Sequence, residues 1–154
     1  MIAPVDEASD GERQPIQAAR DLAAMSSSRR SGADAPNLIM LIVEPDNQIR
    51  GQAARVLCDA GYGVLEASSG IQAFVTFELN PQIGLICTDL CLPDFDGYKL
   101  ADVAKLRRPL VRIVYTGAIP LARDKLGVVH GPILEKPYSP CDLAGVVRRL
   151  LHSV

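Results

Sequence analysis

Two hydrophobic patterns alternate along residues 37–154. Short, nearly continuous apolar runs predict strands that are covered on both faces, as in a parallel sheet. They lie at 38–43, 63–67, 83–88, 110–116 and 132–136. Between these runs, apolar residues recur at helical spacing and predict helices. The helical segments are Ile49–Ala60, Gly70–Leu79, a stretch around Leu100–Ala104, a short Ile119–Leu126 and the residues that follow Ser139.

This alternation predicts an α/β fold, a doubly wound parallel sheet of five strands with five helices on its two faces. In such folds the binding site lies outside the carboxyl ends of the strands. The polar residues that follow the apolar runs are therefore the candidates for chemistry: Glu44, Asp46, Asp89, Thr116 and Lys136. If the central strands are neighbours, these side chains converge on one pocket.

Residues 1–36 have a different composition from the rest of the chain. The stretch "SSSRRSGADAP" (26–36) is small, polar and turn-prone, so it brings little apolar surface to offset the entropy of ordering a chain. Residues 16–25 suit a short helix that is marginal in water by itself. We therefore expect a mostly disordered extension at 1–36 and one domain at 37–154.

Composition excludes several classes of protein. With 48% hydrophobic residues, 22% charged residues and a net charge of -2, the chain fits an ordinary globular protein without the basic face that nucleic acid requires. No apolar run approaches a membrane span, and the N-terminus lacks a secretory core, so we expect a cytoplasmic protein without membrane contact. The four cysteines lack paired metal-ligand spacing, and we expect them to be buried, reduced thiols.

The candidate residues have a chemistry in common. Clustered carboxylates repel one another and suit a hard cation such as Mg²⁺, which takes one or two carboxylates, several waters and a phosphate oxygen. A hydroxyl and an ammonium group match the remaining oxygens of a phosphoryl group. Because aspartate can act as a nucleophile, the set predicts a carboxylate that accepts a phosphoryl group beside a metal.

Residues 37–154 resemble the receiver domain of bacterial response regulators. Four stretches carry the resemblance: "LIVE" (41–44), "TDLCLPDFDGY" (88–98), "YTG" (115–117) and "EKPY" (135–138). It implies a flavodoxin-like, CheY-like fold with strand order 2-1-3-4-5. It also implies a single-domain response regulator of a phosphorelay, with a sensor histidine kinase or a histidine phosphotransfer protein as partner. The downstream protein stays open, as does a homodimer.

The resemblance also implies roles for individual residues. Asp89 becomes the phosphoacceptor, with phosphohistidine as donor. Thr116 contacts the phosphoryl group and Lys136 pairs with it. The metal ligands are Asp89, Glu44 and the backbone carbonyl of Cys91.

Two positions depart from the family pattern. Receivers usually carry two adjacent acids after the first strand, but Pro45 stands at the second place and offers no side-chain oxygen, which weakens the expected Mg²⁺ site. Asp46 comes one place late, and we interpret it as a helix cap in preference to a metal ligand. Ile133 stands where many receivers place an aromatic ring that reorients, so signalling must use another element.

Other functions are weighed beside the switch. Pro45 and Ile133 favour a pseudo-receiver, an interaction module that works without phosphorylation. The "DFDG" motif of Asp94 and Asp96 resembles that of small phosphohydrolases, but Pro93 precedes it, which favours loop chemistry before the third helix. We therefore expect no enzyme beyond a switch that assists its own phosphorylation. The resemblance further implies a cis Lys136–Pro137 bond.

Overall fold

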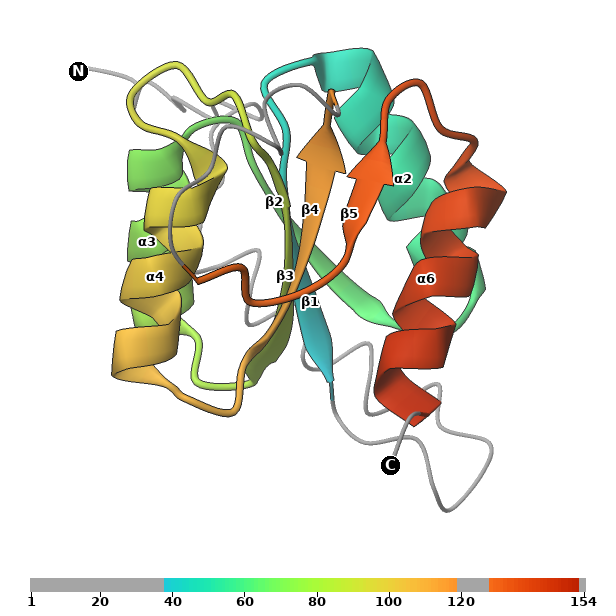
Figure 1. Cartoon of the computed structure of the whole chain (residues 1–154). Coiled ribbons are helices and arrows are strands. Elements are labelled where there is room, and N and C mark those ends of the chain that lie inside the picture. Colours follow the sequence, from blue (N-terminus) through green and yellow to red (C-terminus); the bar gives the residue numbers. More distant parts are fainter. Residues whose placement is uncertain (1–37, 119–127, 153–154) are drawn as a thin grey trace, which may run out of the picture.

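The computed structural model describes residues 38–118 and 128–152. Within them, five strands and four helices follow one another along the chain (Figure 1). The strands are β1 (Ile39–Val43), β2 (Gly63–Ala67), β3 (Ile83–Asp89), β4 (Arg112–Gly117) and β5 (Ile133–Glu135). The helices are α2 (Asn47–Asp59), α3 (Gly70–Leu79), α4 (Gly97–Arg107) and α6 (Pro140–His152).

The strands form one parallel sheet in the order β2-β1-β3-β4-β5. The predicted fold class and strand order are therefore confirmed. The described residues contain four of the five expected helices; the one expected at 119–126 lies outside them. The disordered extension expected at 1–36 also lies outside the described residues and stays a prediction.

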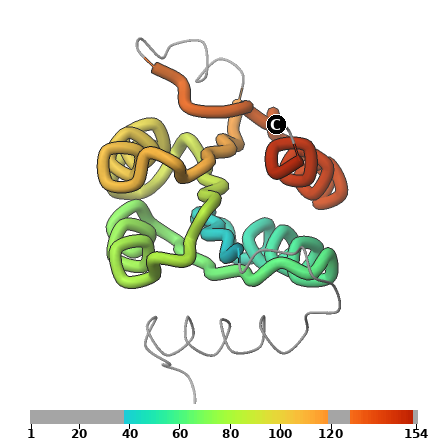
Figure 2. Tube along the Cα trace, turned by 90° about the horizontal axis from the view of Figure 1, so that it is seen from below, coloured from blue at the N-terminus to red at the C-terminus, as the bar shows by residue number. Residues whose placement is uncertain are grey.

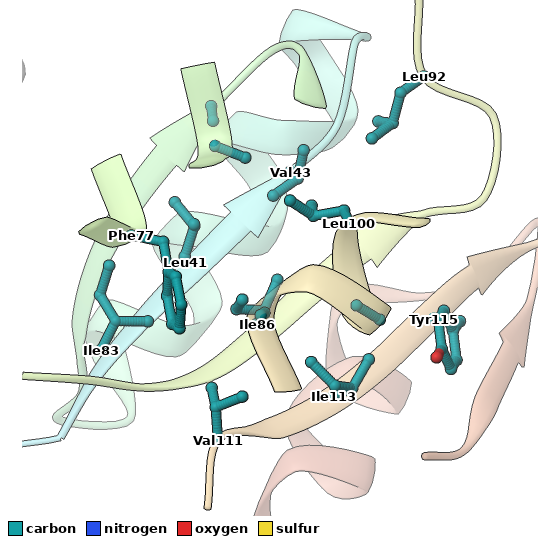
Figure 3. Close-up of a cluster of buried hydrophobic side chains, with 14 of the residues drawn as sticks. Leu41, Val43, Phe77, Ile83, Ile86, Leu92, Leu100, Val111, Ile113 and Tyr115 are labelled. Atoms are coloured by element: carbon teal, nitrogen blue, oxygen red, sulfur yellow. The ribbon is translucent and has the colours of Figure 1, made fainter. Parts of the chain in front are cut away.

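Helices cover both faces of the sheet, with α3 and α4 on one side and α2 and α6 on the other (Figure 2). Successive residues of β1 serve the two sides in turn, as the two-residue period of a strand requires. Leu41 and Val43 join the cluster beneath α3 and α4, whereas Met40 and Ile42 join the cluster beneath α2 and α6. The first cluster includes Phe77, Leu100 and Tyr115 (Figure 3).

The helix boundaries follow capping chemistry that the sequence contains. Asp46, Ser69 and Asp96 accept main-chain N–H bonds at the starts of α2, α3 and α4. Ser139 and Asp142 bond reciprocally at the start of α6, as in a capping box. These caps fix where the chain leaves each strand, and so where the residues between strand and helix point.

The expectation that all four cysteines are buried is wrong. Cys87 on β3 is buried, but Cys58 is half-buried and both Cys91 and Cys141 are exposed. The exposed pair lies outside the sheet, in the loop after β3 and in the first turn of α6. No helix among residues 38–118 and 128–152 has the length and apolar character needed to cross a membrane.

Candidate functional site

The carboxyl ends of β1, β3 and β4 bring three predicted site residues to one edge of the sheet. Glu44 follows β1 directly and Asp89 is the last residue of β3, and both are buried. Thr116 on β4 stands opposite Asp89 in the strand register, and it is buried too. Burying a polar side chain is costly unless it has a hydrogen-bonding or charged partner, so Glu44, Asp89 and Thr116 need partners.

Lys136 supplies the partner for both carboxylates. Its Nζ lies 2.5 Å from Oε1 of Glu44 and 3.1 Å from Oδ2 of Asp89. Burial works to lower the pKa of Lys136, but hydrogen bonds and charge attraction from Glu44 and Asp89 outweigh it and raise the pKa above its ordinary value. The main-chain N–H of Lys136 donates to the carbonyl of Gly117, and the predicted cis bond to Pro137 is confirmed.

The remaining oxygens of the two carboxylates are held by main-chain N–H groups. Oε2 of Glu44 accepts from Asp46 at 3.0 Å, and Oδ1 of Asp89 accepts from Cys91 at 3.3 Å. The second bond is long for an N–H···O contact. Oδ1 is therefore the more weakly held oxygen of Asp89.

Asp46 confirms the capping interpretation. Its Oδ1 accepts from the N–H groups of Gln48 and Ile49, each at 2.9 Å. Arg50, one turn into α2, donates to the carbonyl oxygen of Glu44 at 2.8 Å and so fastens the helix to the end of β1. Pro45 lies between Glu44 and Asp46, and both the helix cap and the Arg50 contact form with the proline in place. A metal-binding role for Asp46 stays a prediction.

The oxygen donors suit Mg²⁺ only in part. Asp89, Glu44 and the Cys91 carbonyl are hard donors of the kind this ion prefers, and Mg²⁺ keeps several waters in any case. However, Lys136 already balances the charge of the two carboxylates. Residues 38–118 and 128–152 hold no group of three His, Cys, Asp or Glu side chains that suits a metal. The donor set fits a weak Mg²⁺ site.

The loop after Asp89 is built by the "DFDG" motif. Asp94 accepts from the N–H groups of Gly70 and Ile71 at 2.8 and 2.7 Å, and Asp96 caps α4 by accepting from Lys99 at 2.7 Å. Although desolvation works to raise the pKa of Asp94, the N–H groups of Ile71 and Gly70 outweigh it and lower that pKa. Both aspartates therefore do structural work, as the loop interpretation predicted. The bond from Asp94 to the start of α3 was not foreseen.

Gly97 explains why this loop can pass so close to the site. A Cβ at Gly97 would collide with the main-chain oxygen of Asp89. The N–H of Gly97 donates to the carbonyl of Leu90 at 3.0 Å. Glycine thus lets the first turn of α4 pack directly against the end of β3.

A second polar group near the site escaped the sequence reasoning. Tyr115 precedes Thr116 on β4, is fully buried, and lies 4.9 Å from the ring of Tyr98. Burial raises the pKa of Tyr115. Its hydroxyl accepts from the N–H of His130, whose ring lies 2.8 Å from Asp102 of α4. The only sequence signal was an aromatic residue inside an otherwise aliphatic strand.

A cleft of about 320 Å³ opens beside Lys136, between α2 and the loop that leads into α6. Its walls include Ile49 and Gln52 from the helix and Pro137 and Tyr138 from the loop. Burial raises the pKa of Tyr138 strongly. The cleft adjoins the site but does not contain Asp89 among its lining residues.

Comparison with known proteins agrees with this geometry, although no family model matches the chain. The response regulator receiver protein CpdR of Brucella abortus is 30% identical over 115 residues, which are 73% of this chain and 95% of CpdR. The chain belongs to the response-regulator receiver family. This receiver is also 28% identical to the sensor kinase CckA of the same organism, but the match spans only 12% of that kinase.

Solved receiver structures have the same fold. A response regulator receiver protein from Sinorhizobium medicae is 30% identical and superposes with a TM-score of 0.67, over 75% of this receiver and 95% of that chain. The receiver domain of the hybrid histidine kinase CckA is 28% identical, with a TM-score of 0.63 over 74% and 99% of the two chains. The chemotaxis regulator CheY4 of Vibrio cholerae, 21% identical with a TM-score of 0.66 over 73% and 98%, shares the fold.

Proposed function

We propose that this receiver is a phosphorylation switch of a two-component phosphorelay, in which Asp89 accepts a phosphoryl group from a phosphohistidine and the output is contact with a protein partner. The observation that carries the proposal is the bridge from Lys136 to both Glu44 and Asp89. It places a cation beside a nearly buried carboxylate that can act as a nucleophile, and so offsets the cost of burying that charge.

In the transfer, an Asp89 oxygen attacks phosphorus while the bond from phosphorus to the donor's imidazole nitrogen breaks, and the imidazole leaves as the nitrogen base. Oδ1 suits the attack because it is held by only the long contact to Cys91. Lys136 then pairs with a phosphoryl oxygen, and the hydroxyl of Thr116, opposite Asp89 on β4, donates to another. Asp89, Lys136 and Thr116 thus each have one role in the transfer.

Asp89, the Cys91 carbonyl and Glu44, the last of these through water, would hold a Mg²⁺ ion, with Asp46 as an alternative donor only if it gave up its cap. When bound, Mg²⁺ neutralises charge on the incoming phosphoryl group. Because Pro45 supplies no carboxylate, we expect weaker binding than in a receiver with two adjacent acids. Self-phosphorylation from a donor is the only catalytic activity proposed, and the cytoplasm is the proposed compartment.

The partner is a sensor histidine kinase or a histidine phosphotransfer protein. Two features support this. The relatives include a sensor kinase and a response regulator receiver protein. The cleft offers apolar walls, including Ile49 and Pro137, next to Lys136. The pseudo-receiver is the competing function, and the features that favour it are Pro45 and Ile133, the two departures from the family pattern.

One experiment separates the two functions. The protein is incubated with a small phosphodonor and Mg²⁺, and its intact mass is followed over time. We expect uptake of a single phosphoryl group, lost in Asp89→Asn and retained in Asp59→Asn, a control at the end of α2 far from the strand ends. Absence of uptake by the wild type at high donor concentration would establish the pseudo-receiver. Uptake by Asp89→Asn would move the acceptor elsewhere.

A further inference from the structure

Helix α3 carries a line of apolar side chains on the side that faces solvent, beside the exposed Gln72 and Glu78. Ile71, Val75 and Leu79 have exposures of 62%, 46% and 49%, and their spacing of four residues places them in one line along the helix. With a rise of 1.5 Å per residue, that line is about 12 Å long. Ala73 and Phe77 on the other side are fully buried in the core. We call Ile71, Val75 and Leu79 the outer stripe.

Helix α3 has almost no charged residues that would favour exposure of the outer stripe to solvent. The only charged residue in Gly70–Leu79 is Glu78, and its Oε1 lies 3.2 Å from Nε of Arg107 on α4. By contrast, α2 carries Arg50, Arg55 and Asp59. A helix that faces solvent normally has a charged outer face, whereas the core of a protein–protein interface is poor in charge. The outer stripe has the composition of an interface.

We propose that the outer stripe is a self-association surface, on which α3 of a second copy packs antiparallel about a two-fold axis. The stripe is apolar at both ends and at its centre, so it is complementary to itself. An axis at Val75 places Ile71 against Leu79 of the partner subunit at each end. The Glu78–Arg107 pair on its border has no net charge, so two copies meet without like-charge repulsion.

A second copy satisfies this surface better than a charged partner does. A charged surface would lose water on docking and find no free opposite charge along α3, because Glu78 is already paired with Arg107. The line is short compared with the roughly 800 Å² per partner of a standard interface. The association should therefore be weak and depend on protein concentration.

Sedimentation velocity on the full chain, from low micromolar to near-millimolar concentration, tests the proposal. We expect the wild type to shift from monomer to dimer across this range. Val75→Lys, at the centre of the stripe, should stay monomeric. Leu110→Lys is the matched control, because Leu110 is 92% exposed in the turn after α4 and lies outside the stripe. Both variants should melt at the wild-type temperature, since each changes an exposed side chain.

A pair of charges then tests the antiparallel geometry. Ile71→Lys and Leu79→Glu should each weaken the dimer by at least tenfold, whereas the double variant should recover most of the loss. The introduced lysine and glutamate meet only across the axis, because within one helix they stand about 12 Å apart. Three results would overturn the proposal: a wild type that is monomeric throughout, a dimer that survives Val75→Lys, or a double variant no better than the single ones.

Discussion

The hydroxyl of Tyr115 accepts a hydrogen bond from the main-chain N–H of His130. Tyr115 directly precedes Thr116, which stands opposite Asp89 in the strand register. His130 in turn contacts Asp102 on α4, so the end of β4 is joined to that helix through a buried phenol. Because Ile133 has no ring to reorient, we expect a shift of Thr116 to reach α4 through this Tyr115–His130 bond.

Tyr115→Phe should remove that bond while keeping the ring packed on Tyr98. We expect a loss of about 1 kcal/mol in the free energy of unfolding, the usual contribution of one hydrogen bond. We also expect phosphorylation to shift the amide resonance of His130 in the wild type and to leave it nearly unmoved in the variant. Urea unfolding and two-dimensional NMR measure the two effects. Tyr62→Phe is the control, and an equal response of His130 in Tyr115→Phe would show that the bond carries no signal.

Pro45→Asp should restore the missing carboxylate beside Glu44. Since Mg²⁺ gains a second acidic ligand, its binding should tighten by about tenfold and phosphorylation from a small donor should accelerate. Mg²⁺ titration and the time course of intact mass report the two quantities. Asp46→Ala is the companion variant: it should lose about 1 kcal/mol of stability with the helix cap yet bind Mg²⁺ as the wild type does. Weakened Mg²⁺ binding in Asp46→Ala would make Asp46 a ligand.

Lys136→Ala should leave the carboxylates of Glu44 and Asp89 facing each other without a cation. We expect a loss of about 1–3 kcal/mol at neutral pH, because unpaired buried charges are costly, together with strongly reduced phosphorylation. Because the pKa of Lys136 is raised above 10.5, its contribution is fully present below about pH 10 and is lost as the pH rises through the raised pKa.

The pH profile of that variant supplies its internal control. The difference from the wild type should narrow as the pH rises through the raised pKa of Lys136, because the wild type then loses this charge too. Denaturant unfolding at several pH values measures it. A difference that stays constant as the pH rises through the raised pKa of Lys136 would mean that Lys136 stabilises the fold by packing alone.

The cysteines should differ in their reactivity according to how deeply each thiol is buried. Burial, with Glu44 and Asp89 nearby, raises the pKa of Cys87 to about 12, so this thiol stays protonated and unreactive at pH 8. Cys91 and Cys141 are exposed and should react quickly. Peptide mapping after brief alkylation identifies the labelled positions. Rapid labelling of Cys87 in the folded protein would show that β3 is accessible to solvent.

Some features could be predicted from the sequence because they depend on local patterns. The apolar runs before Glu44 and Asp89 predicted their strands, and residues beyond a strand end in a parallel sheet meet at one edge. The cap formed by Asp46 followed from its distance to the helix. The bond from Asp94 to α3 and that from Tyr115 to His130 join distant segments, and their distances depend on tertiary packing that no local pattern encodes. The exposure of Cys91 and Cys141 depends on the same long-range geometry.

The two aspartates of the loop after Asp89 also fix how that loop can vary. Asp94 is bonded to the first turn of α3, and two positions later Asp96 caps α4. Inserting or deleting one residue between them would pull one aspartate out of reach of its helix. Diversity at this edge of the site is therefore confined to exchanging side chains at constant loop length, with Phe95, which covers Gly70, as the position between the two anchors.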